Sequence, residues 1–166
     1  MRHNYHIRPA TVSDLPVILQ LAEATWASTY SSILTQEQIA YMFEVIYAEE
    51  ALKAQMQEGQ TFLLLYEGDK PVGFAAYSVK HEAERLYKLN KIYLLPQCQG
   101  KGYGKALLSA VEEEVKQKGA FALDLNVNRH NKAKQFYERC GYSVYQQEDI
   151  PIGPYWMNDY VMRKAL

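Results

Sequence analysis

The sequence has no long hydrophobic run, almost no excess charge and few cysteines. No apolar stretch approaches the ~18 residues that a membrane-spanning helix requires. The formal net charge is −1 over 166 residues, whereas nucleic-acid-binding proteins usually carry a basic excess. The two cysteines, Cys98 and Cys140, lack C-x-x-C spacing and are too few for a disulfide framework. We therefore expect no membrane or nucleic-acid partner, and no metal site.

The length of the chain and its first residues suggest its organisation and compartment. A chain of 166 residues fits one domain spanning 1–166. The opening hexapeptide, MRHNYH, has no apolar core of the kind found in secretory signal peptides, so we expect a cytoplasmic protein. The sequence leaves open whether that protein is a monomer or a homodimer.

Hydrophobic periodicity predicts an α/β fold built on a mixed sheet. Ser13 is expected to cap a first helix, and Thr35 with Gln38 forms a capping-box pair that opens a second helix running to about residue 59. Two later helices are expected over 104–118 and 131–139. Strands are expected over 5–8, 61–66, 72–79, 87–94, 121–127, 142–147 and 155–163.

The most informative segment is a loop with three alternating glycines, Gly100, Gly102 and Gly104, between a predicted strand and a predicted helix. Glycine lets the backbone turn sharply and approach a ligand closely. The first N–H groups of the helix have no partner within it, and the helix dipole adds roughly half a positive charge there. Lys101 and Lys105 add full positive charges. Together these features predict a cradle for a pyrophosphate.

Two common nucleotide-binding motifs do not fit this loop. The dinucleotide fingerprint requires G-x-G-x-x-G, whereas the spacing here is G-x-G-x-G. The P-loop requires a glycine where the chain has Gln99 and a serine or threonine where it has Ala106. The loop therefore indicates a phosphate ligand of another class.

Two segments together resemble the GNAT superfamily of N-acetyltransferases. Residues 99–104, QGKGYG, match its Q/R-x-x-G-x-G/A motif, and residues 123–142, LDLNVNRHNKAKQFYERCGY, resemble its strand–Asn–helix–Phe-Tyr–Gly segment. The resemblance covers about 61–163 well. It implies an α/β, GNAT-like fold with a mixed, mostly antiparallel sheet, flanking helices and splayed central strands. It also implies an acyltransferase that takes acetyl from acetyl-coenzyme A.

The same resemblance implies a cofactor site. The loop amides would hold the pyrophosphate of coenzyme A, and main-chain groups of the splayed strand would pair with its pantetheine arm. Asn131 would contact pantetheine or a phosphate, in addition to any role as a helix cap. The candidate cofactor-binding residues are Ile92, Tyr93, Leu94, Gln99, Gly100, Lys101, Gly102, Tyr103, Gly104, Lys105, Asn131 and Tyr137.

The same resemblance implies that Tyr137 is the general acid, and the chemistry of the reaction is consistent with a phenol there. An amine attacks the thioester carbonyl, and the leaving group is a thiolate of pKa ~8.5. A phenol can protonate that thiolate without being ionised itself at neutral pH. The alternative is a tyrosine that only packs in the core.

The general base is harder to identify. An alkyl ammonium of pKa ~10.4 must lose a proton before it can attack. Many relatives carry a glutamate on the strand before the loop, but this chain has Lys88, Leu89, Asn90 and Lys91 there. Glu82 and Glu84 precede that strand, and Asp159 lies on the last strand. Of these three carboxylates, Asp159 is the best single candidate, either as the base or as an anchor for the amine.

The acceptor amine is suggested by both ends of the chain. Residues 26–30, WASTY, and 155–162, YWMNDYVM, look like the bacterial spermidine/spermine acetyltransferase branch. Three functions stay open: acetylation of a small amine with polyamines favoured, acetylation of a protein or peptide amine, and a non-catalytic acyl-coenzyme A-binding regulatory module. The candidate acceptor-binding residues are Trp26, Tyr30, Tyr77 and Asp159.

Overall fold

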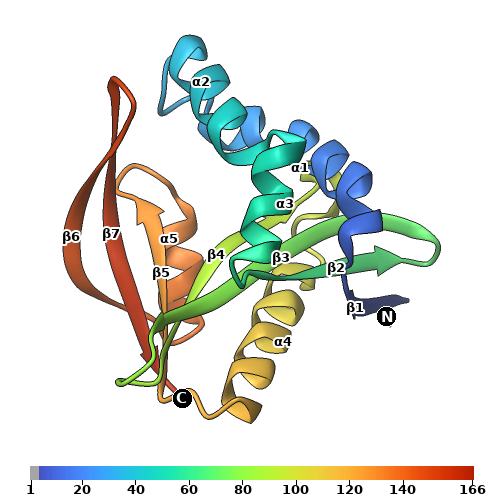
Figure 1. Cartoon of the computed structure of the whole chain (residues 1–166), viewed down its shortest axis with the longest axis vertical. Coiled ribbons are helices and arrows are strands. Elements are labelled where there is room, and N and C mark those ends of the chain that lie inside the picture. The colour runs from blue at the N-terminus through green and yellow to red at the C-terminus, as the bar shows by residue number, and fades with distance from the viewer. Residues whose placement is uncertain (1–3) are drawn as a thin grey trace.

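The computed structural model describes residues 4–166, which fold around one seven-stranded sheet (Figure 1). Every neighbouring pair of strands is antiparallel except β4 and β5, which are parallel. The predicted α/β fold with a mixed, mostly antiparallel sheet is therefore confirmed. In sheet order the strands are β1 (Tyr5–Pro9), β2 (Thr61–Glu67), β3 (Lys70–His81), β4 (Leu86–Leu94), β5 (Ala122–Asn128), β7 (Tyr155–Ala165) and β6 (Ser143–Ile152).

The central strands β4 and β5 separate halfway along β4. Their pairing runs only from Leu86 opposite Ala122 to Leu89 opposite Leu125. On the other side of β4, the register with β3 shifts after Leu89, leaving Asn90 as an extra residue. Such a bulge bends a strand and increases its twist. The remainder of β4 therefore turns away from β5, which confirms the expected splay.

Helices cover both faces of the sheet (Figure 1). On one face lie α1, α2 and α3, while α4 and α5 lie behind the other. Helices and sheet pack through fully buried side chains, for example Ile18 of α1, Leu64 of β2 and Leu107 of α4. The helices span α1 (Leu15–Tyr30), α2 (Gln36–Tyr47), α3 (Glu49–Gln57), α4 (Tyr103–Gln117) and α5 (Ala133–Arg139).

Three helix boundaries differ from the sequence-based expectations. Ser13 does not cap α1, because a 3-10 turn over Val12–Asp14 precedes it and the Asp14 carboxylate accepts a hydrogen bond from the Thr11 N–H at 2.8 Å. The helix expected to run to about residue 59 is broken at Ala48, whose ψ of 145° is not helical. Asn131 lies before α5, and its Oδ1 accepts a hydrogen bond from the Ala133 N–H at 2.9 Å.

The predicted N-cap of α2 is confirmed, because the Thr35 hydroxyl accepts a hydrogen bond from the Gln38 N–H at 3.1 Å. The second half of that capping box is not formed. The Gln38 side chain instead donates from Nε2 to the Trp156 carbonyl at 3.0 Å, which ties α2 to the tip of the β6–β7 hairpin. Among residues 4–166, no helix is both long and apolar enough to cross a membrane.

Candidate active site

A cleft of about 900 Å³ opens where β4 and β5 separate. The second half of β4 and the end of β5 form its walls, the start of α4 and one side of α5 close one end, and the last turn of α1 borders it. Main-chain groups of β4 on the β5 side have no strand partner beyond Leu89, so their N–H and C=O groups face this space. Ile92, Tyr93 and Leu94, the three predicted residues of β4, all line the cleft.

The glycine loop shapes the end of the cleft next to α4. Gly100 and Gly102 both have a φ of +82°, which L-residues rarely adopt, and a Cβ at either position would meet nothing within 4 Å. The backbone therefore turns here without any side chain between it and a ligand. Gln99, Gly104 and Lys105 line the same end, where the first N–H groups of the 15-residue helix α4 are unpaired within the helix.

Two predicted loop residues point elsewhere. Tyr103 is buried and its hydroxyl donates a hydrogen bond to the Glu67 carboxylate at the end of β2. Lys101 Nζ also approaches Glu67 Oε2, at 3.3 Å. The structure therefore places these two side chains outside the cleft, where they fix the loop against the sheet. Lys105 is the loop cation that lines the cleft.

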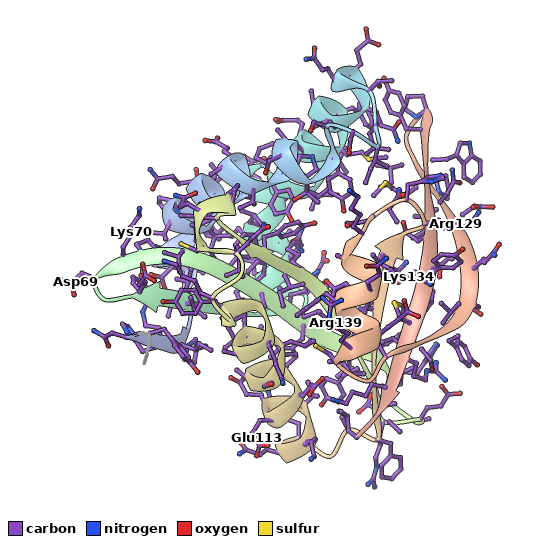
Figure 2. The ribbon with its side chains drawn as sticks, turned by 180° about the vertical axis from the view of Figure 1, so that it is seen from behind. Asp69, Lys70, Glu113, Arg129, Lys134 and Arg139 are labelled. Atoms are coloured by element: carbon purple, nitrogen blue, oxygen red, sulfur yellow. The ribbon has the colours of Figure 1, made fainter. Side chains whose placement is uncertain are left out.

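Basic residues that the sequence reasoning missed stand at the same end. Arg139, at the end of α5, lines the cleft together with Lys132 and Phe136. Figure 2 shows Arg139, Lys134 and Arg129 along α5 and the loop before it, on the far side of the molecule from the Asp69–Lys70 turn. Helical spacing was the available signal, because Phe136 and Arg139 are three residues apart and share a helix face.

Asn131 and Tyr137 both line the cleft, as expected. The Tyr137 side chain is only 8% exposed, and burial raises the pKa of its phenol, with a smaller contribution from Tyr30. The phenol is therefore protonated at neutral pH. Within residues 4–166 its hydroxyl has no hydrogen-bond partner, so it is available to a group that enters the cleft.

Asp159 lies buried on the face of the sheet that α1 covers. Its side chain is 5% exposed; Oδ2 accepts a hydrogen bond from Asn126 Nδ2 at 3.3 Å, and Oδ1 has no partner among residues 4–166. Burial raises the pKa of this carboxyl, and the hydrogen bond from Asn126 and, to a smaller extent, the charge of Lys88 lower it in part. Asn126 itself lines the cleft, so one hydrogen bond connects the cleft wall to this carboxylate.

Of the four predicted acceptor residues, Tyr30 lines the cleft, Asp159 lies next to its wall through Asn126, and the other two lie elsewhere. Tyr30 lines the cleft, and the charge of Asp159 is one of the influences that raise the pKa of its phenol, after burial and Tyr93. Trp26 packs against Tyr30 and donates from Nε1 to the Ile39 carbonyl at 3.2 Å, outside the cleft. Tyr77 donates to Glu114 Oε1 of α4 at 2.7 Å, on the opposite face of the sheet.

Across residues 4–166, no three His, Cys, Asp or Glu side chains gather as metal ligands would. The chemistry offered by the cleft is that of unpaired main-chain groups, a helix N-terminus, basic side chains and one phenol. Such a surface fits an elongated ligand with an anionic end and a polar arm.

Comparison with known proteins agrees with this geometry. A family model described as the acetyltransferase (GNAT) domain matches residues 30–153. The chain is 27% identical over 164 residues to the spermidine N(1)-acetyltransferase of Thermoplasma acidophilum, covering 95% of each protein. It is 31% identical over 117 residues to the ribosomal protein bS18-alanine N-acetyltransferase of Haemophilus influenzae, covering 70% of this chain and 77% of the relative.

Solved structures show the same similarity over nearly the whole chain. The PaiA N-acetyltransferase of Thermoplasma acidophilum, crystallised in complex with coenzyme A, superposes with a TM-score of 0.82 at 27% identity, covering 98% of this chain and 99% of that one. A GCN5-related N-acetyltransferase of Rhodopseudomonas palustris superposes with a TM-score of 0.84 at 23% identity, covering 100% and 99%. The chain belongs to the GNAT family and is an acetyl-coenzyme A-dependent N-acetyltransferase.

Proposed function

We propose that this enzyme acetylates a small primary amine, with polyamines such as spermidine favoured. The observation that carries the proposal is Asp159, a buried carboxylate with one unpaired oxygen beside the wall of the cofactor cleft. Buried polar atoms in proteins almost always have a partner, so an unpaired carboxylate oxygen is a place where a ligand's ammonium would bind. The spermidine acetyltransferase among the relatives supports the same class of acceptor.

In this proposal the cleft holds acetyl-coenzyme A along β4. Its pyrophosphate would rest on the loop amides at Gly100, Gly102 and Gly104, with Lys105 and Arg139 compensating the phosphate charge. Its pantetheine arm would pair with the unpaired main chain of Ile92–Leu94, as a strand would. The thioester would then lie near Leu89, where β4 and β5 begin to separate.

The residues around that point would carry the chemistry. Bound acetyl-coenzyme A supplies the acetyl group as a thioester. Asp159 would bind the acceptor ammonium, and its carboxylate or water would take the proton that the nitrogen must lose before attack. The neutral amine would then attack the thioester carbonyl directly, without an acyl-enzyme. The N–C bond forms as the C–S bond breaks, and the nitrogen loses its second proton to water. Tyr137 would give its proton to the departing sulfur, since its phenol is protonated and lines the cleft.

Acylation of an enzyme cysteine has less support. Cys98 is buried and lies outside the residues that line the cleft. Burial raises the pKa of the Cys140 thiol, which disfavours the reactive thiolate. Direct attack by the amine needs neither thiol.

The alternative is a peptide or protein amine, which the alanine N-acetyltransferase relative suggests. The contact between α2 and the hairpin tip favours the smaller acceptor. Besides the Gln38–Trp156 hydrogen bond, the rings of Tyr41 and Tyr155 lie 5.4 Å apart, and a Cβ on Gly153 would collide with the Tyr41 ring. These contacts join α2 to the hairpin whose strand β7 carries Asp159, and they would obstruct a folded protein or a long peptide.

A direct test is an acceptor screen with purified protein, acetyl-coenzyme A and detection of the released thiol. Spermidine, spermine and short diamines are compared with peptides that carry free N-terminal alanine or internal lysine. We expect the polyamines to give the highest kcat/KM. Faster turnover of peptides would show that the acceptor is a peptide or protein amine and not a small amine. Binding of acetyl-coenzyme A without turnover of any amine would favour the regulatory-module alternative.

A further inference from the structure

We call the face of the sheet that carries Asp159 and that α1 covers the acceptor face. Lys88 differs from the other cations on this face because its ammonium has no partner in the part of the chain that the structure describes. Asp124 is fully buried and pairs with both Lys80 Nζ at 2.8 Å and Arg163 Nε at 2.6 Å. Lys91 Nζ donates to Gln60 Oε1 at 2.8 Å. Within residues 4–166, by contrast, Lys88 Nζ donates no hydrogen bond and lies within 4 Å of no carboxylate.

The sheet register shows that Lys88 shares its face with Asp159. Lys88 lies opposite Asp124 on β5, and Asp159 lies opposite Asn128 on the same strand. Alternate residues of one strand share a face and directly opposite residues project to the same side, so Lys88, Asn126 and Asp159 all project to the acceptor face. The Asn126–Asp159 hydrogen bond agrees with this assignment.

Lys88 lies beside the end of the cleft at which β4 and β5 still pair, and its side chain does not itself line the cleft. It precedes Leu89, the last residue of β4 that pairs with β5 and one that lines the cleft. A cofactor whose phosphates rest on the loop after β4 runs back along the strand, and its acyl group reaches this end. The side chain of Lys88 is only half-buried, so it retains freedom to move toward the thioester.

We propose that Lys88 is itself an acetyl acceptor, modified within the same molecule when no amine substrate is bound. This inference rests on the proposed site for acetyl-coenzyme A. Lys88 Nζ, in its neutral form, attacks the acetyl carbonyl carbon; the new N–C bond forms and the C–S bond breaks. Coenzyme A leaves as the thiolate and takes a proton from Tyr137, while the nitrogen loses its proton to water or Asp159.

The surroundings of Lys88 favour this chemistry. Burial lowers the pKa of its ammonium, with a further contribution from Lys80, so the neutral nucleophile is more abundant than at a free lysine. The charged groups within its electrostatic reach are Lys80, Lys91, Glu148, Asp159 and Asp124. Acetylation would remove one positive charge from among these carboxylates, and the pocket would then attract a polycation more strongly.

The experiment is peptide mapping by mass spectrometry of the full chain after incubation with acetyl-coenzyme A and no amine. We expect one acetyl group per molecule, located on Lys88, at a rate that does not change when the enzyme is diluted. Tyr137→Phe should slow this modification by ~10²-fold or more, and spermidine should suppress it. Lys88→Arg should lack the modification while the chain still folds, and exposed Lys53 and Lys116 serve as controls for non-enzymatic acetylation.

The outcomes separate this inference from the proposed function. Acetylation that is spread over exposed lysines, that depends on enzyme concentration, or that spares Lys88 while polyamines turn over would overturn the inference alone. Acetylation of Lys88 without turnover of any small amine would instead count against the proposed acceptor class.

Discussion

Asn126 Nδ2 donates a hydrogen bond to Asp159 Oδ2 at 3.3 Å and thereby connects the wall of the β4–β5 cleft to a buried carboxylate. The other oxygen, Oδ1, has no partner within residues 4–166. A carboxylate kept in this state is costly for folding, because burial penalises its charged form. Such a cost is common where a protein needs a charge for a ligand.

The first prediction concerns binding of the acceptor. Replacing Asp159 by Asn preserves the shape of the side chain and removes its charge. A hydrogen bond to a charged group contributes roughly 1.5–3 kcal/mol, so KM for spermidine should rise ~10–100-fold, while KM for acetyl-coenzyme A stays unchanged. If Asp159 is instead the base, kcat falls and recovers at high pH, where the amine deprotonates itself. An unchanged profile for both constants would remove Asp159 from the site.

The same variant should be more stable than the wild type at neutral pH. The pKa of Asp159 is raised in the folded state, so the stability that this group contributes is complete below its unfolded pKa of ~3.9 and is lost as pH rises through the folded pKa. Asp159→Asn has no titratable carboxyl at this position, so its stability does not fall with pH for this reason. Urea unfolding at pH 4 and pH 8 should therefore show a stability advantage for the variant that is larger at pH 8.

A second prediction tests the proposed acid. Tyr137→Phe removes only the hydroxyl, so the packing of the ring and the affinity for acetyl-coenzyme A should be retained. Loss of general acid catalysis should lower kcat by ~10²–10⁴-fold. Single-turnover measurements check this, because they report the chemical step. A variant with wild-type single-turnover rates would reduce Tyr137 to a core aromatic.

A third prediction compares two glycines with similar backbone conformations. Gly102 in the loop and Gly68 in the β2–β3 turn have φ values of +82° and +60°, and an added Cβ meets nothing within 4 Å at either position. Alanine at each should therefore cost a similar ~1–2 kcal/mol of stability. Only Gly102→Ala should weaken acetyl-coenzyme A binding, measured by thermal shift. For the wild type, cofactor at 100 times its Kd should stabilise the fold by ~2.7 kcal/mol. Equal weakening by both variants would contradict the assignment of the loop.

A fourth prediction concerns Lys91. Burial, with a smaller contribution from the charge of Lys88, lowers the pKa of its ammonium to about 7. A lysine whose pKa is lower in the folded state binds fewer protons when folded. It therefore destabilises the fold fully below pH ~7, and this destabilisation disappears as the pH approaches the unfolded pKa of ~10.4. Lys91→Met should therefore stabilise the fold more at pH 6 than at pH 9. Lys53→Met, on the exposed side of α3, is the matched control and should show no such dependence. A pH-independent difference would contradict the burial of the charge.

The sequence by itself determined the elements whose signals are local. A compact apolar run, a turn and a second strand-like segment predicted β2 and β3, and three glycines between a strand and a helix predicted the sharply turned loop at one end of the cleft. The cap of α2 by Thr35 was equally local. In each case the residues that interact are neighbours in the chain, so their spacing carries the information.

Only the tertiary structure decided which side chains meet. Tyr77 pairs with Glu114 behind the sheet instead of reaching the cleft, because the face of β3 onto which α4 packs is set by long-range contacts. Lys101 and Tyr103 are held by Glu67 of a distant strand. Lys88 and Asp159 belong to β4 and β7, and they share a face because both strands flank β5 in one register. Strand order and register are non-local, so the composition of the acceptor side cannot be read from the sequence alone.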